Sequence, residues 1–168
     1  MRRIAKFEKV SFAQFEEGYK DCFPDAADAG EAYEAITLPV RATSGSAGYD
    51  FRTTADFTLA PGEEIKIPTG IRAKIADGWV LNIYPRSGLG FKFRLQLNNT
   101  VGIIDSDYYN SSNEGHIFIK VTNDSKTGKT VELKRGDAFA QGVFLEYGIT
   151  EDDCATAERD GGFGSTSK

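Results

Sequence analysis

The chain has 168 residues, of which 40% are hydrophobic and 27% are charged, and this length allows one domain with a sizeable buried core. Its net charge of −5 disfavours a free-standing nucleic-acid binder, because such proteins usually carry a basic surplus. A polyphosphate ligand would therefore have to be held by a few placed cations, backbone N–H groups and a metal ion rather than by a broad positive field.

The sequence gives no sign of export or of membrane insertion. No apolar run follows Arg2 and Arg3, so we expect no signal peptide, and no stretch approaches the ~20 apolar residues of a membrane span. Cys22 and Cys154 are too far apart for a CxxC motif, and we expect two reduced thiols in the cytoplasm. His116 is the only histidine, which makes a zinc site or a catalytic triad a poor interpretation.

Residues 1–37 are predicted to form an N-terminal helical extension. Ser11 can cap a first helix whose aromatic residues recur at helical spacing, and Pro24 ends that segment. A second short helix is predicted over residues 25–36, where small and apolar side chains share one face. Packing on the main fold is a sufficient role for this extension.

Residues 38–158 have the sequence pattern of short strands separated by turns, and we predict one β domain there. Residues 65–75 alternate apolar and polar side chains, which indicates a half-buried strand pair with a kink near Pro68-Thr69-Gly70. Turn signals separate further predicted strands at 79–84, 117–121, 130–133 and 140–145. Many short strands at close spacing predict a β-sandwich, jelly roll or barrel. Residues 159–168, rich in Gly and Ser, are expected to be a mobile segment.

Two segments in the first half of this domain suggest ligand chemistry. In Ser46-Ala47-Gly48-Tyr49-Asp50, small residues permit close backbone approach, and Asp50 could reach the hydration shell of a cation. In the segment 84–90, successive N–H groups and the Ser87 hydroxyl could form a concavity for an anion. Arg86 could bind phosphate or lock a carboxylate. Taken alone, the first segment is better explained as a turn entering a strand, whereas the second fits a hairpin turn with a salt bridge equally well.

A third segment, residues 98–108, gathers polar side chains after a predicted buried strand. Asp105 and Asp107 are two residues apart, so on extended backbone they would point the same way at the rim of the core. Carboxylates in such a place can act as a base or orient the waters of a metal ion. Asn99 offers both a donor and an acceptor, which suits the imide edge of a nucleobase.

The last two segments lie near the C-terminus. Residues 135–141 read as a turn into a strand, with Gln141 as a polar residue in an apolar run, and the Arg-Gly-Asp triplet there is a coincidence. In residues 159–166, glycines flank Phe163, with Arg159 before it and hydroxyl groups after it. A flexible strip that orders over a ligand would have this composition, and a disordered tail is the alternative.

Read in chain order, these five segments resemble the five motifs of the trimeric dUTPases, and the resemblance covers roughly residues 38–168. It implies an all-β, distorted jelly-roll or β-clip fold, a homotrimer with active sites shared between subunits, and hydrolysis of dUTP to dUMP and pyrophosphate with Mg²⁺. That reaction keeps uracil out of DNA and supplies dUMP for dTMP synthesis. Partners other than dUTP, dUMP and the sister subunits, such as a nucleic acid or a membrane, are not expected.

The resemblance also implies roles for single residues. Asp105 resembles the carboxylate that activates the attacking water, Tyr108 the ring beneath the deoxyribose, and Asn99 the amide that reads uracil, helped by the backbone near Ile103 and Ile104. The residues that contact the phosphates would be Arg86, Ser87, Gly88 and Gln141. Asp50 would be the carboxylate that holds a metal ion through a water molecule. The lid over the ligand would comprise Arg159, Phe163, Gly164 and Ser165.

The chain departs from the family pattern at two places. Residues 109–115 are longer than the usual short turn, and only Asp160 separates Arg159 from Gly161, where two residues are more usual. Three other interpretations stay open at this point: a dCTP deaminase on the same fold, a catalytically idle relative that binds a protein partner, and a structural or sugar-binding jelly roll.

Overall fold

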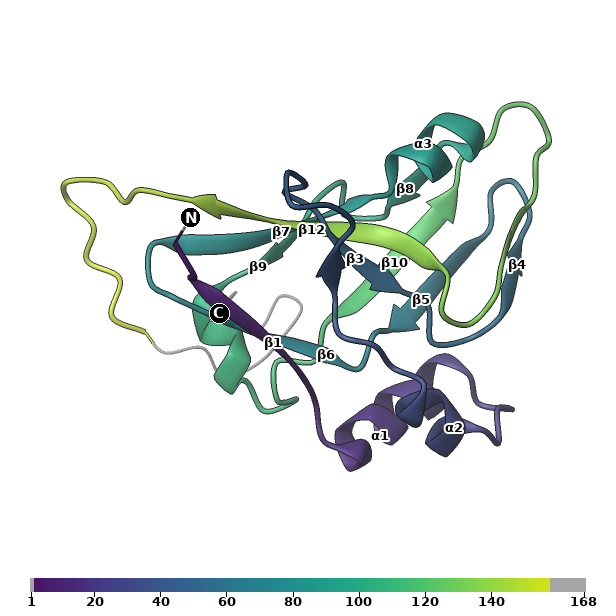
Figure 1. The fold of residues 1–168 in the computed structure, drawn as a ribbon, viewed down its shortest axis with the longest axis horizontal. Helices are drawn as coiled ribbons and strands as arrows, with labels where there is room; N and C mark the ends of the chain where they lie inside the picture. Colours follow the sequence, from purple (N-terminus) through teal and green to yellow (C-terminus); the bar gives the residue numbers. More distant parts are fainter. Residues whose placement is uncertain (1, 158–168) are drawn as a thin grey trace.

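The computed structural model describes residues 2–157, and most of its regular elements are strands (Figure 1). The helices are α1 (Phe12–Cys22), α2 (Ala29–Glu34), α3 (Ser87–Phe93) and the 3-10 helix η1 (Ser106–Asn110). The strands are β1 (Ala5–Lys9), β2 (Val40–Arg41), β3 (Tyr49–Arg52), β4 (Phe57–Leu59), β5 (Glu64–Pro68), β6 (Ile71–Ile75), β7 (Trp79–Pro85), β8 (Leu95–Leu97), β9 (Gly102–Ile104), β10 (Phe118–Asn123), β11 (Val131–Leu133) and β12 (Ala138–Glu146). This content confirms the predicted all-β class.

The strands pair into one larger sheet and several small ones. The larger sheet has five strands in the order β2-β3-β12-β7-β9, and a three-stranded sheet has the order β5-β10-β8. The remaining pairs are β11 with β4 and β1 with β6. All these pairings are antiparallel, as expected for short strands joined by turns. Among residues 2–157, no helix is long and apolar enough to cross a membrane.

The strand pair expected over residues 65–75 is present as β5 and β6, and the break between them contains Thr69 and Gly70. Side chains that alternate along these strands enter a core that includes Ile67, Ile71 and Ala73. The other four predicted strands are present as β7, β10, β11 and β12. Alternation and turn signals thus located these strands, whereas the short strands β2, β4, β8 and β9 were not predicted.

The two helices expected before residue 38 are also present. Ser11 caps α1, since its hydroxyl oxygen accepts a hydrogen bond from the backbone N–H of Gln14 at 3.2 Å. Phe15 and Tyr19 of α1 are buried in a cluster of their own against the small residues of α2. The second helix begins at Ala29, later than the expected residue 25, and both helices lie together at the lower edge of Figure 1.

The first residues form a strand that the sequence analysis did not predict. β1 pairs antiparallel with β6 over its whole length, from Ala5 opposite Ile75 to Lys9 opposite Ile71. Phe7 is the one large apolar side chain in Ala5–Lys9, so the segment carries almost no alternation to detect. The helices α1 and α2 consequently stand as an insertion between β1 and β2.

Candidate functional site

A cleft of about 600 Å³ lies beside β9 and brings together four of the predicted site residues. Asn99, Ile103, Ile104 and Tyr108 all line it. They come from the turn after β8, from β9 and from η1, so a stretch of ten residues provides one wall of the cleft. β9 itself is fixed by pairing with β7, with Ile103 opposite Asn82.

The two asparagines of the β8–β9 turn differ in what their amides contact. The amide N–H of Asn98 donates to Glu64 at 2.7 Å, and its amide oxygen accepts from the Thr122 hydroxyl at 2.8 Å. Within residues 2–157, the exposed amide of Asn99 has no hydrogen-bond partner. Of these two asparagines, Asn99 is therefore the one whose amide donor and acceptor are not used by contacts among the described residues.

Asp105 lies where β9 passes into η1. Its backbone is extended (φ −77°, ψ 159°) and its carbonyl oxygen accepts from the N–H of Tyr108 at 3.3 Å. Asp105 is half-buried, whereas Asp107 is exposed. The expectation that both carboxylates point the same way from extended backbone is wrong, because Asp107 lies inside the 3-10 helix.

Tyr108 is buried, with only 7% of its surface exposed. Its hydroxyl donates to the carbonyl oxygen of His116 at 2.7 Å and accepts from the side-chain amide of Asn113 at 2.8 Å. Both partners follow it closely in the chain. The ring is thereby fixed at its hydroxyl end while it contributes to the cleft wall.

The cleft has further wall residues that the sequence analysis did not single out. Lys66 of β5 and Lys120 of β10 face each other across a strand pair, and Phe118 lies two residues before Lys120. The Lys66 ammonium pairs with Asp21 of α1 at 2.7 Å and lies 5.3 Å from the Phe118 ring centroid. Nothing in the local sequence signals these residues, because β5 and β10 pair with each other in the three-stranded sheet and reach the cleft from a different sheet than β9.

A second group of predicted residues gathers where β3, β12 and β7 adjoin. Gln141 stands opposite Asp50 on one side and opposite Tyr84 on the other, and its amide N–H donates to the carbonyl oxygen of Pro85 at 3.4 Å. Arg86 follows β7 directly, and its Nε lies 3.3 Å from Oδ1 of Asp50. Of the two roles weighed for Arg86, the single chain shows the pairing with a carboxylate.

Ser87 and Gly88 begin α3 directly after Arg86, where the sequence suggested a turn with an anion-binding concavity. None of Asp50, Arg86, Ser87, Gly88 and Gln141 lines the cleft beside β9. The structure thus places the predicted site in two separate groups. The predicted lid residues, Arg159, Phe163, Gly164 and Ser165, lie outside the described residues.

The carboxylates of the described chain offer little direct ligation to a metal ion. Within residues 2–157, no group of three or more His, Cys, Asp or Glu side chains is placed to hold one. Asp50 is a single carboxylate with 17% of its side chain exposed, paired with Arg86. This donor set fits a hydrated Mg²⁺ that takes most of its ligands from water and phosphate.

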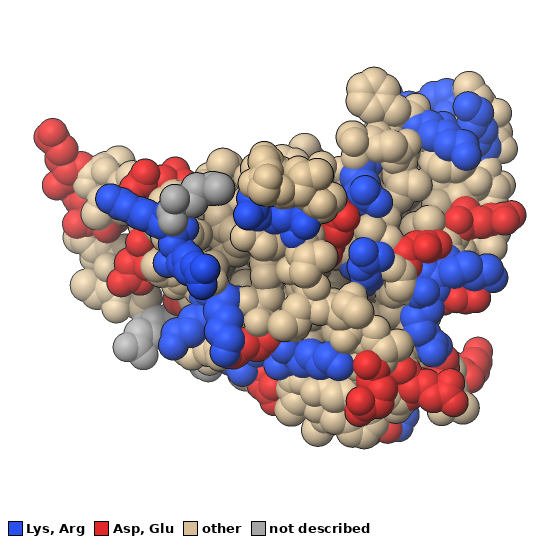
Figure 2. Space-filling view, viewed as in Figure 1, with Lys and Arg blue, Asp and Glu red and all other residues tan. Residues whose placement is uncertain are grey.

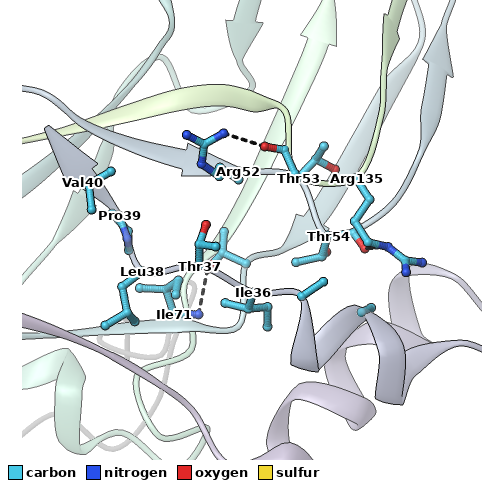
Figure 3. Close-up of a pocket in the computed structure, with 14 residues that line it drawn as sticks. Ile36, Thr37, Leu38, Pro39, Val40, Arg52, Thr53, Thr54, Ile71 and Arg135 are labelled. Atoms are coloured by element: carbon cyan, nitrogen blue, oxygen red, sulfur yellow. Dashed lines mark hydrogen bonds between the residues drawn. The ribbon is translucent and has the colours of Figure 1, made fainter. Parts of the chain in front are cut away.

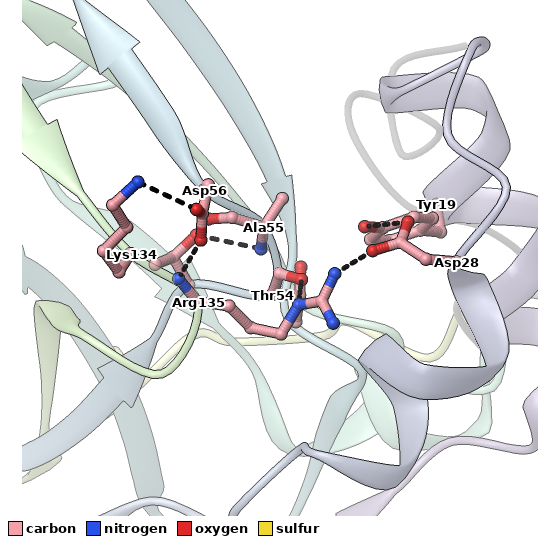
Figure 4. A network of polar contacts seen from close by, with 8 residues as sticks. Tyr19, Asp28, Thr54, Ala55, Asp56, Lys134 and Arg135 are labelled. Atoms are coloured by element: carbon pink, nitrogen blue, oxygen red, sulfur yellow. Dashed lines mark hydrogen bonds and ion pairs between the residues drawn. The ribbon is translucent and has the colours of Figure 1, made fainter.

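The Arg-Gly-Asp triplet is a turn into β12, as expected, and it also anchors the inserted helices (Figure 4). The backbone N–H of Arg135 donates to Asp56 at 2.8 Å, and its Nε donates to the carbonyl oxygen of Thr54 at 3.1 Å. The guanidinium group pairs with Asp28, which also accepts from the Tyr19 hydroxyl at 3.1 Å. Arg135 is therefore committed to contacts within the chain.

A further cleft, of about 340 Å³, lies between α2 and β3 (Figure 3). The segment from Ile36 to Val40 forms one wall, and Arg52 lies opposite with its guanidinium donating to the Gly136 carbonyl oxygen at 2.7 Å. None of the predicted site residues lines it.

On the face drawn in Figure 2, Lys and Arg side chains are interspersed with Asp and Glu rather than gathered into one field.

Comparison with known proteins points to the same family as the order of the five motifs. A family model described as dUTPase matches residues 34–167. The deoxyuridine 5′-triphosphate nucleotidohydrolase of Lactococcus lactis is 43% identical over 134 residues, which are 78% of this chain and 88% of that protein. The enzyme of the same name from Actinobacillus pleuropneumoniae is 43% identical over 147 residues, covering 83% of this chain and 93% of that protein.

Solved structures show the same fold. The dUTPase of Streptococcus mutans has 32% identity and a TM-score of 0.63, over 86% of this chain and 98% of that chain. A mutant dUTPase of phage phi11 of S. aureus, in which a structural Mg(II) ion is coordinated, has 20% identity and a TM-score of 0.64, over 92% and 98% of the two chains. At that lower identity the likeness concerns the fold alone. Sequence, motif order and fold together establish that this chain belongs to the dUTPase family and is a dUTP diphosphatase.

Proposed function

We propose that Asp105 activates the water that hydrolyses dUTP, with the base and sugar bound in the cleft beside β9. The main support is that one cleft is lined by Asn99, Ile103, Ile104 and Tyr108. Asp105 lies between Ile104 and Tyr108 in the chain. In this proposal the half-buried Asp105, which directly follows Ile104 of the cleft wall, holds the attacking water beside the phosphate chain. General-base assistance of this kind typically contributes 10²–10⁴-fold to a rate.

Hydrolysis of the triphosphate requires mainly that the protein position the substrate, the water and the base. Water adds to phosphorus, its proton passes to the Asp105 carboxylate, and the bridge between the α- and β-phosphates breaks, so that dUMP and pyrophosphate leave. Phosphoryl transfer of this kind depends on an in-line water and on neutralisation of the developing charge. A single placed carboxylate is a sufficient base for it.

Uracil recognition is assigned to Asn99 together with the backbone of Ile103 and Ile104. The Asn99 amide can donate to a carbonyl oxygen and accept from the imide N–H of uracil, a pattern that cytosine does not complete. A pyrimidine held against β9 is crowded where thymine carries its methyl group. Tyr108 is assigned to the deoxyribose, where its ring leaves no room for a 2′-hydroxyl. A site built for these contacts leaves polar groups unpaired with the wrong base.

The phosphates are assigned to the second group of residues, Arg86, Ser87, Gly88 and Gln141. Because this group does not line the cleft of its own chain, we propose that the chain works as a homotrimer in which a neighbouring subunit brings it to the cleft. The lid formed by Arg159, Phe163, Gly164 and Ser165 completes the site in this proposal. The wider role is to keep uracil out of DNA and to supply dUMP, in the cytoplasm.

Mg²⁺ is the proposed cofactor, and when bound it neutralises charge on the triphosphate. Asp50 would orient one of its waters rather than ligate it directly, in keeping with the lone carboxylate observed there. Arg86 holds that carboxylate in place at 3.3 Å. This arrangement predicts that the metal binds with its nucleotide rather than to the free protein.

A substrate panel tests the proposal. The full chain is incubated with each deoxynucleoside triphosphate and Mg²⁺, and pyrophosphate and ammonia are both measured. We expect pyrophosphate from dUTP and no ammonia from dCTP. Ammonia from dCTP would instead identify a deaminase, and no pyrophosphate from dUTP would leave only binding roles for the cleft.

A further inference from the structure

The loop that follows Tyr108 is built to hold the hydroxyl of that residue. Asn113 donates to the hydroxyl at 2.8 Å, and the hydroxyl donates to the His116 carbonyl oxygen at 2.7 Å. Asn113 is itself fixed, since its side-chain oxygen accepts from the N–H of Gly115 at 3.1 Å and its carbonyl oxygen accepts from the N–H of His116 at 3.1 Å. This loop is the segment, residues 109–115, that is longer than the usual turn of the family.

The loop has a backbone shape that few residues accept. Glu114 and Gly115 both have positive φ, 58° and 71°, which is disfavoured for residues other than glycine. A Cβ at position 115 would lie 2.7 Å from the carbonyl oxygen of Tyr108. The loop therefore packs directly on the backbone of Tyr108 as well as on its hydroxyl.

Glu114 ties this loop to the inserted helices. Its carboxylate accepts from the backbone N–H of Ser11 at 2.8 Å and from the Ser11 hydroxyl at 2.6 Å. Ser11 is the residue that caps α1. The hydrogen bonds from Ser11 lower the pKa of the Glu114 carboxyl, so the carboxylate is charged at neutral pH and the bonds are charge-assisted.

The 3-10 helix η1 has a separate anchor that does not pass through this loop. The Arg72 guanidinium donates to the carbonyl oxygen of Tyr109 at 2.6 Å and lies 3.6 Å from the centre of its ring. The Tyr109 hydroxyl donates to Glu8 of β1 at 2.5 Å. Loss of the Asn113 and Glu114 contacts should therefore loosen the Tyr108 ring without releasing η1 from the sheet.

We propose that Asn113 and Glu114 are positioning residues that fix the Tyr108 ring against the sugar and so set the preference for deoxyribose over ribose. This inference rests on the proposed function, in which Tyr108 excludes a 2′-hydroxyl. Ser11, at the start of α1, belongs to the same device, so the inserted helices contribute to sugar selectivity from outside the cleft. The position of the Tyr108 ring must be fixed closely, because a ring that can shift would make room for the 2′-hydroxyl of a ribose.

The test compares kcat/KM for dUTP with kcat/KM for UTP in the wild type and in Asn113→Ala. Removing one neutral hydrogen bond and the support of the loop should lower the dUTP-to-UTP ratio about tenfold. Most of the change should come from a higher kcat/KM for UTP and a higher KM for dUTP, with kcat for dUTP nearly kept. Glu114→Gln, which loses one of two acceptors for Ser11, should lower the ratio by a smaller factor and remains informative if Asn113→Ala fails to fold.

Asp28→Asn is the matched control. It weakens the ion pair with Arg135 at the other end of the inserted helices, so it lowers the melting temperature without touching the loop. We expect it to keep the wild-type ratio. The inference is overturned if folded Asn113→Ala or Glu114→Gln keeps the wild-type ratio, or if Asp28→Asn lowers the ratio as much as they do. A wild type that does not hydrolyse dUTP overturns the proposed function, and the inference falls with it.

Discussion

At the scale of single residues, His116 shows how the core supports the cleft. Its side chain is fully buried, and Nε2 accepts from the backbone N–H of Gly70 at 2.9 Å. The ring lies against Phe118 with centroids 4.2 Å apart. Burial lowers the pKa of His116 to about 4, so the imidazole is neutral at pH 7. A neutral, buried histidine of this kind is a core residue rather than a catalytic one.

This burial predicts a pH dependence of stability. The unfolded chain takes up a proton at His116 near pH 6.5 and the folded chain only near pH 4, so the stability present above pH 6.5 is lost as the pH falls from 6.5 to 4. Between pH 7 and pH 5 the loss should be about 2 kcal/mol. His116→Gln can accept from Gly70 and does not titrate, so its unfolding free energy in urea should lack this component. Parallel pH profiles for the two proteins would contradict the prediction.

At the scale of elements, the sheet centre depends on close packing at β12. Gly142 pairs with Ile83 of β7 and Tyr49 of β3, and a Cβ there would lie 2.8 Å from Leu81 and 2.9 Å from Phe51. Its φ is not in the left-handed region, so the requirement is one of space alone. The small residue lets β12 pass under side chains from both neighbours.

Gly142→Ala should therefore lower the free energy of unfolding by about 1–3 kcal/mol through overpacking. Gly148→Ala is the control, because a Cβ at that position meets nothing within 4 Å. Its unfolding free energy should stay within about 0.5 kcal/mol of the wild type. Urea unfolding monitored by circular dichroism gives both values, and equal effects of the two substitutions would refute the packing argument.

The elements also show what the sequence could and could not predict. Alternation revealed β5 and β6, and capping by Ser11 revealed α1, because these signals are local. α3 was missed because Ser87–Phe93 contains two glycines, which are poor helix formers. The cleft residues near Asp105 were predictable from one stretch of chain, whereas Lys66, Phe118 and Lys120 reach it only through strand pairing. The support of Tyr108 by Asn113 and Glu114 needed the folded loop to be seen.

At the scale of the whole molecule, the predicted site is divided. The cleft beside β9 holds the residues assigned to base and sugar, and the ends of β3, β7 and β12 hold those assigned to phosphate. A homotrimer reconciles the two groups if each cleft receives its phosphate contacts from a neighbour. Closed rotational symmetry would then give every cleft the same environment.

Subunit mixing tests this arrangement. Asp105→Asn and Arg86→Ala are each expected to inactivate the protein when alone. Unfolding the two together at equal amounts and refolding them should restore activity to about a quarter of wild type, because random assembly leaves that share of shared sites intact. No recovery, in mixtures shown by light scattering to be trimeric, would place Asp105 and Arg86 of each site in one chain.

The central claim is that Asp105 activates water for the hydrolysis of dUTP, and one measurement addresses it directly. Pyrophosphate release from dUTP with Mg²⁺ is compared between the wild type and Asp105→Asn, with dUTP binding measured for both by calorimetry. We predict that the variant binds dUTP within a few-fold of wild type and turns it over at least about 10²-fold more slowly. Turnover by Asp105→Asn at the wild-type rate would contradict the account.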